Sequence, residues 1–196
     1  MSLLLFSNIV LWIVVVIQIA VIFALARQIG ILFERVSPVG AMISDSGPAL
    51  GDKVPGMALP DLNGPGLTLG GGDKAQLVFF LSTSCPNCKA LLPALKSIRA
   101  DEGQWLDVIL ASDGREALHR RLIEAEGLDS FPYVLSSELG MSFRVSKLPF
   151  AVLIDRHGKV AAKGLVNSRE QLESLFTASE TGIPSYQAAV AGMTPS

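Results

Sequence analysis

Cys85 and Cys88 are the only cysteines among the 196 residues of this chain, and two residues separate them. The apolar run 76–81 precedes the pair, and residues 89–100 after it have the pattern of a helix. A strand that leads a Cys-x-x-Cys pair into the start of a helix suits thiol–disulfide exchange. There the first thiolate meets unpaired backbone N–H groups and the positive end of the helix dipole. We therefore expect Cys85 to be the nucleophile and Cys88 to resolve the mixed disulfide.

Other uses of two cysteines fit the sequence less well. Zinc requires about four ligands, and His119 and His157 lie far from the pair without ligand-like spacing. A purely structural disulfide that closes so short a loop contributes little stability. Val78 and Ser82 occupy the places of the proline and threonine in the peroxiredoxin pattern, which argues against peroxide as the substrate. We predict a site without a metal or a cofactor.

The first 26 residues contain no ionisable side chain. As a helix, residues 3–26 would extend for about 36 Å, which exceeds the hydrocarbon thickness of about 30 Å. The alternative is a cleaved signal peptide, but the apolar stretch is longer than the usual ~7–15 residues and no Lys or Arg precedes it. We predict a retained, single transmembrane helix over residues 3–26.

The orientation of the predicted anchor follows from two opposing arguments. Arg27 and Arg35 come directly after it, and the positive-inside rule would place them and the remaining chain in the cytoplasm. Disulfide exchange is more useful outside the cytoplasm, where disulfides persist. We expect a single-pass protein of the cell membrane whose soluble part lies in the periplasm. The formal net charge of −2 gives no basic surface for nucleic acid.

The chain divides into the predicted anchor, a stalk over 27–50, one domain over 51–178 and a flexible tail over 179–196. Hydrophobic periodicity and turn residues predict, in order, a hairpin over 57–69, a strand over 76–82, a helix over 89–100, a strand over 105–111, a helix over 115–126, a strand over 133–135, a helical turn over 138–143, a hairpin over 150–165 and a helix capped by Ser168. This order predicts an α/β thioredoxin-like fold with an N-terminal β-hairpin extension. In the helix over 115–126, we expect Leu118, Leu122 and Ala125 to face the core.

Two proline positions extend the resemblance to the thioredoxin family. Pro93 lies eight residues after Cys85, where thioredoxins carry a proline that kinks the active-site helix. The segment Leu148-Pro149-Phe150, directly before a strand, resembles the cis-proline segment of that family. The resemblance implies that Leu148 and Pro149 bind substrate, because a cis proline there presents neighbouring backbone to an incoming peptide.

The sequence departs from the thioredoxin pattern around the cysteines. Phe79 stands six residues before Cys85, where thioredoxins have a buried acid that moves protons. Ser84 replaces the usual tryptophan, and Pro86-Asn87 replaces Gly-Pro inside the motif. Pro86 has no N–H to offer the thiolate, and Asn87 carries no charge. These departures favour oxidase or isomerase work over reduction, although the direction of electron flow is not encoded.

A closer resemblance is to the MauD family of methylamine utilization proteins. It rests on the uncharged N-terminal span, on Ser-Cys-Pro-Asn-Cys-Lys at 84–89 and on the Leu-Pro-Phe segment. It implies a periplasmic factor of methylamine metabolism that forms or isomerises disulfides in the small subunit of methylamine dehydrogenase. A membrane redox partner is compatible with this role.

Two alternatives remain open. Residues 51–55 and the hairpin after them are similar to periplasmic thiol reductases of the cytochrome c maturation type. The other alternative is a membrane-tethered chaperone or scaffold without a redox role.

Overall fold

The computed structural model describes residues 2–35 and 47–181, which belong to two separate units. The first unit contains helix α1 (Ser2–Arg35), so the predicted anchor and the start of the stalk are helical. Across the described residues, no helix combines the length and the hydropathy that crossing a membrane requires. The anchor therefore stays a prediction from the sequence. Residues 36–46 of the predicted stalk and 182–196 of the predicted tail lie outside the described residues.

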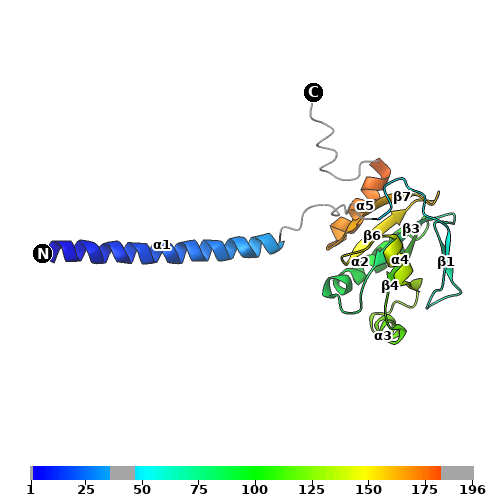
Figure 1. Cartoon of the computed structure of the whole chain (residues 1–196), viewed down its shortest axis with the longest axis horizontal. Helices are drawn as coiled ribbons and strands as arrows, with labels where there is room; N and C mark the ends of the chain where they lie inside the picture. The colour runs from blue at the N-terminus through cyan, green and yellow to red at the C-terminus, as the bar shows by residue number, and fades with distance from the viewer. Residues whose placement is uncertain (1, 36–46, 182–196) are drawn as a thin grey trace, which may run out of the picture. The chain divides into compact units, whose positions relative to one another are not determined.

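The second unit is built on a five-stranded sheet with the order β5-β4-β3-β6-β7 (Figure 1). Strands β3, β4 and β5 are parallel, and β6 and β7 are antiparallel to their neighbours. A separate antiparallel pair, β1 and β2, forms the predicted N-terminal hairpin. The strands are β1 (Met57–Leu59), β2 (Leu67–Leu69), β3 (Ala75–Phe80), β4 (Leu106–Ser112), β5 (Tyr133–Leu135), β6 (Phe150–Ile154) and β7 (Val160–Leu165). The helices are α2 (Pro86–Glu102), α3 (Glu116–Glu126), α4 (Ser137–Ser142) and α5 (Arg169–Thr181).

The central strands bury side chains on both faces of the sheet, as their continuous apolar sequences predict. Along β3, Leu77 and Phe79 join one core cluster, whereas Val78 and Phe80 join another, because successive side chains point to opposite faces. The first cluster includes buried residues of α2, α3 and α5, and the second includes residues of α4 and of the hairpin. This mixed sheet with helices packed on both faces is the predicted thioredoxin-like fold.

Helix α3 differs from its prediction in the face that it buries. Leu118 and Ala125 are exposed, so placing them in the core was wrong, whereas Leu122 is buried as expected. The inward face instead carries His119 and Ile123. His119 is buried because both of its ring nitrogens have hydrogen-bond partners inside the domain, which offsets the cost of removing a polar ring from water.

Candidate thiol–disulfide exchange site

Helix α2 begins directly at the cysteine pair. Cys85 is the N-cap residue, with extended backbone angles (φ −88°, ψ 109°), and Pro86 occupies the first turn. The Cys85 Sγ accepts a hydrogen bond from the backbone N–H of Cys88 at 3.1 Å. Sulfur thus takes the place of the usual Ser, Thr or Asp oxygen at a helix N-cap. The same N–H and the helix dipole would stabilise a thiolate at Cys85.

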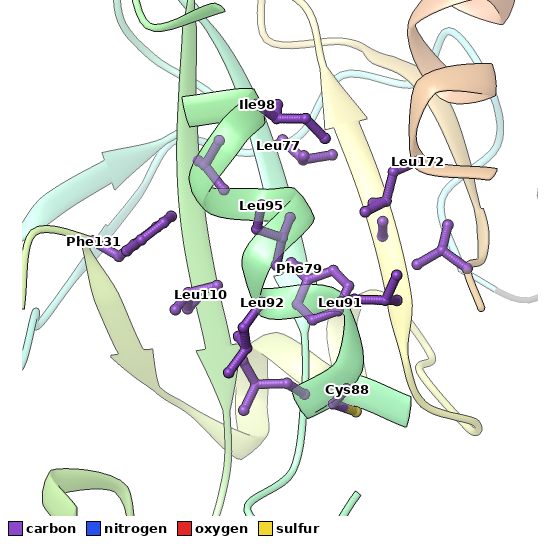
Figure 2. Packing of buried hydrophobic residues seen from close by; sticks show 14 of the residues in the cluster. Leu77, Phe79, Cys88, Leu91, Leu92, Leu95, Ile98, Leu110, Phe131 and Leu172 are labelled. Carbon is purple, nitrogen blue, oxygen red and sulfur yellow. The ribbon is translucent and has the colours of Figure 1, made fainter. Parts of the chain in front are cut away.

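The two cysteines form a disulfide whose Cα atoms lie 5.3 Å apart. Their environments differ sharply: Cys88 is only 1% exposed, whereas Cys85 is partly exposed. Figure 2 shows Cys88 in the first turn of α2, on the side that carries Leu91 and Leu92 into the core. An incoming sulfur therefore has access to Cys85 and not to Cys88.

The other predicted residues of the motif lie on α2. Pro86 and Asn87 are exposed beside the disulfide. Pro93 sits inside the helix, which nevertheless continues to Glu102. Pro86 is compatible with the first turn of the helix, because its missing N–H would have no intrahelical partner there.

The register of the sheet brings the predicted cis-proline segment beside the cysteines. Phe80 of β3 pairs with Phe150 of β6, so Leu148 and Pro149 lie next to the chain that leads from β3 to Cys85. The Leu148–Pro149 peptide bond is cis. Pro149 is buried and its carbonyl accepts from the Val166 N–H at 3.1 Å, whereas Leu148 is 38% exposed. The segment thus presents an apolar side chain to solvent at the edge of the site.

Phe79 stands at the place of the thioredoxin acid and is fully buried. It belongs to the same core cluster as Cys88, and Figure 2 shows its ring next to α2, the helix that carries Cys88. A benzyl side chain can neither accept nor donate a proton. Proton transfer to or from Cys88 must therefore use another group, such as water or the partner thiol.

A buried polar pair, His119 and Tyr133, was not predicted from the sequence. The His119 Nε2 lies 2.8 Å from the carbonyl oxygen of Asp113, which only accepts, so Nε2 carries the proton. Nδ1 then accepts from the Tyr133 hydroxyl at 2.8 Å. Burial raises the pKa of Tyr133, which keeps this donor protonated. The pair fixes the Asp113 loop after β4, near the end of the sheet where the cysteines lie. A lone histidine and tyrosine 14 residues apart give no sequence signal for this contact.

Within the residues that the structure describes, no cluster of three or more His, Cys, Asp or Glu side chains is arranged to hold a metal ion. His119 is engaged in the hydrogen bonds described above. The cysteine sulfurs are bonded to each other. The chemistry that this site offers on its own is exchange at sulfur.

Comparison with known proteins extends over nearly the whole chain. No family model matches. The methylamine utilization protein MauD of Paracoccus denitrificans is 44% identical over 189 residues, which cover 95% of this chain and 94% of that protein. The chain belongs to the MauD family. MauD of Methylobacillus flagellatus is 41% identical, over 92% of this chain and 89% of its own length.

Solved structures resemble the second unit of this MauD-family chain. The thioredoxin domain of a thiol-disulfide oxidoreductase from Bacteroides vulgatus matches with a TM-score of 0.56 and 23% identity, over 67% of this chain and 98% of that domain. StoA from Bacillus subtilis matches with a TM-score of 0.54 and 20% identity, over 66% and 99% of the two chains. These likenesses show the thioredoxin-like fold.

Proposed function

We propose that this MauD-family protein exchanges thiols and disulfides through Cys85 and Cys88, and that its substrate is the small subunit of methylamine dehydrogenase during maturation. The observation that carries the proposal is the asymmetry of the pair: an accessible sulfur at a helix N-cap backed by a buried one. Such an arrangement stabilises a thiolate at the first sulfur and keeps the second for intramolecular attack. The name of its relatives supports the connection with methylamine utilization.

In the oxidising direction, a substrate thiolate attacks the Cys85 Sγ. The disulfide of the protein breaks, and Cys88 leaves as a thiolate that takes up a proton. A second substrate thiolate then attacks the substrate sulfur of the mixed disulfide and releases Cys85. The substrate loses two electrons and two protons, and the protein gains the two electrons as a dithiol. Another round requires a disulfide or quinone-linked oxidant, which we assign to a membrane redox partner.

Isomerisation uses the same two sulfurs without net electron transfer. The reduced Cys85 thiolate attacks a wrongly paired substrate disulfide to form a mixed disulfide, and the freed substrate thiolate attacks a second substrate disulfide and displaces another thiolate from it. The last thiolate to attack the mixed disulfide regenerates Cys85. Cys88 resolves the mixed disulfide only when this rearrangement fails. Oxidation and isomerisation are both compatible with a buried phenylalanine, Phe79, at the place of the thioredoxin acid, since neither reaction depends on a buried acid.

We further propose that residues 3–26 anchor the protein in the cell membrane, with the exchange domain in the periplasm. Support comes from the absence of ionisable side chains in residues 1–26 and from the uninterrupted helix α1. The protein should sediment with membranes after a high-salt wash, and a variant that lacks residues 1–26 should not. A reporter that is active only outside the cytoplasm, fused to the C-terminus, should be active. An inactive reporter would refute the periplasmic orientation.

The substrate is tested by trapping. In Cys88→Ala, the nucleophile remains without its resolving thiol, so mixed disulfides on Cys85 should accumulate in cells grown on methylamine. We expect the captured protein to be the small subunit of methylamine dehydrogenase, and the double variant Cys85→Ala/Cys88→Ala to capture none. Capture of apocytochromes c instead would favour a thiol reductase of the cytochrome c maturation type. A double variant that still supports growth on methylamine would establish a role without redox chemistry.

A further inference from the structure

A cavity of about 290 Å³ lies at the edge of the exchange site. Leu81, which follows β3 and begins the connection to Cys85, forms part of its wall. Leu148, the neighbour of Pro149, forms another part, and Gly140 contributes from α4. The cavity therefore shares its walls with the two segments that frame the accessible sulfur.

The inner part of this cavity is apolar. Phe80, Leu81 and Ala111 line it and are each at most 4% exposed. The serine at the end of β4 does not change this character, because the Ser112 hydroxyl donates to the Leu81 carbonyl at 2.7 Å. Half-buried Val145 adds a further apolar wall.

The charged lining residues are Asp113 and Lys147, and both are exposed. They carry opposite charges, so the cavity has no net charge with which to select an ion. Ser136 also lines the cavity, but its hydroxyl oxygen already accepts from the Leu139 N–H at 3.1 Å as the cap of α4. The other lining serines, Ser137 and Ser146, are exposed. The polar side chains thus lie on the rim or have partners within the domain, which favours an apolar occupant with polar groups around it.

The size of the cavity limits that occupant. Pockets for drug-sized ligands measure about 300–1,000 Å³, so this cavity lies at the lower end and suits one or two side chains. Leu148 leaves 38% of its surface exposed at the wall, which a bound apolar group would cover.

We propose that the cavity receives an apolar side chain of the substrate polypeptide, next to the substrate cysteine that exchanges with Cys85. This inference rests on the proposed function and specifies its substrate class: cysteines flanked by apolar residues. The occupant leaves the exchange reaction itself unchanged and increases the rate at which the substrate sulfur reaches Cys85, since the binding energy holds the reacting atoms together.

The test compares two dithiol peptides that differ only beside the first cysteine, where one carries Leu and the other Gly on both sides. Each reduced peptide is mixed with the oxidised full-length protein, and formation of the peptide disulfide is followed by mass spectrometry. Rates are normalised to the reaction of the same peptide with oxidised glutathione. We expect the Leu peptide to react at least about tenfold faster than the Gly peptide. In an apolar pocket, one additional methylene group of the substrate already increases the rate by roughly tenfold or more.

Two variants test whether the cavity is the origin of this preference. A Cβ atom added at Gly140 meets no other heavy atom within 4 Å, so Gly140→Leu has room to begin an apolar side chain at the cavity wall. Val145→Asp replaces an apolar wall with a charge. Both should lower the Leu-to-Gly rate ratio toward one. Gly56→Leu is the matched control, since Gly56 is equally open and does not line the cavity, and it should keep the wild-type ratio.

A smaller fraction of active protein slows both peptides equally, so the rate ratio does not depend on it. A wild-type ratio near one, or a ratio that both cavity variants leave unchanged, overturns the inference while the exchange function stands. If the wild-type protein neither oxidises these peptides nor exchanges disulfides with their oxidised forms, the proposed function itself fails.

Discussion

After reduction of the Cys85–Cys88 disulfide, iodoacetamide should alkylate Cys85 well before Cys88 at pH values below those at which free thiols ionise. Iodoacetamide reacts with the thiolate, and the structure provides stabilisation for only one of them. The Cys85 Sγ accepts the Cys88 N–H at 3.1 Å at the N-terminus of α2. Cys88 is buried in the apolar cluster beneath that helix, where burial disfavours the charged form.

The size of the difference follows from these contacts. A hydrogen bond to a charged acceptor contributes about 1.5 kcal/mol, and the helix N-terminus adds about 0.5 kcal/mol. The sum of about 2 kcal/mol corresponds to roughly a thirtyfold larger thiolate fraction. A stabilised thiolate is also a weaker nucleophile, with a Brønsted coefficient of about 0.4–0.5, so the rate gain is about five- to eightfold. The low exposure of Cys88, 1%, increases the ratio further.

Labelling for short times, followed by digestion and mass spectrometry, gives the two rates in one sample. The single variants Cys85→Ser and Cys88→Ser provide each rate without the other thiol. In concentrated guanidinium chloride, the preference should disappear, because it depends on the folded helix. If Cys88 is alkylated first, or both thiols react equally in the folded protein, the assignment of nucleophile and resolving thiol is wrong.

Three further predictions concern stability. Burial raises the pKa of Tyr133 above its ordinary value of 10.0, so the unfolded chain loses this proton first, and the free energy of unfolding should fall as the pH rises above 10. Tyr133→Phe should remove this pH dependence. At neutral pH it should also lower the free energy of unfolding by about 1–3 kcal/mol, because it leaves the His119 Nδ1 without its donor. Urea unfolding as a function of pH measures both effects. Arg144 has a left-handed backbone (φ 49°) at the end of α4, so Arg144→Gly should raise the free energy of unfolding in urea by about 0.5–1 kcal/mol; a lower value would show that its side chain compensates. At Gly158, an added Cβ would overlap the carbonyl oxygen of Gly70, and φ is 75°. Gly158→Ala should therefore lower the thermal midpoint, with a cost of about 1–3 kcal/mol, and an unchanged midpoint would contradict this packing.

Local patterns in the sequence were sufficient to predict the order of the elements and the position of the cysteine pair. The apolar run before Cys85 forms β3, and the residues after it form α2 with Pro93 in its interior. The strand over 133–135 has the predicted bounds, and the predicted hairpin over 150–165 forms β6 and β7. These features depend on hydrophobic periodicity, turn residues and helix capping, all of which act over a few neighbouring residues.

Tertiary structure decided which side chains meet. The pairing of Phe80 with Phe150 brings Pro149 to the cysteines across about 60 residues of intervening chain, and no local pattern sets that register. His119 is buried because Tyr133 and the Asp113 carbonyl provide hydrogen-bond partners for its ring nitrogens. Periodicity alone had placed Leu118 in the core. The cavity beside α4 has the same origin, since its walls come from β3, β4, α4 and the segment before β6. Burial of a polar ring and the shape of a cavity depend on partners distant in the chain, which a sequence pattern does not contain.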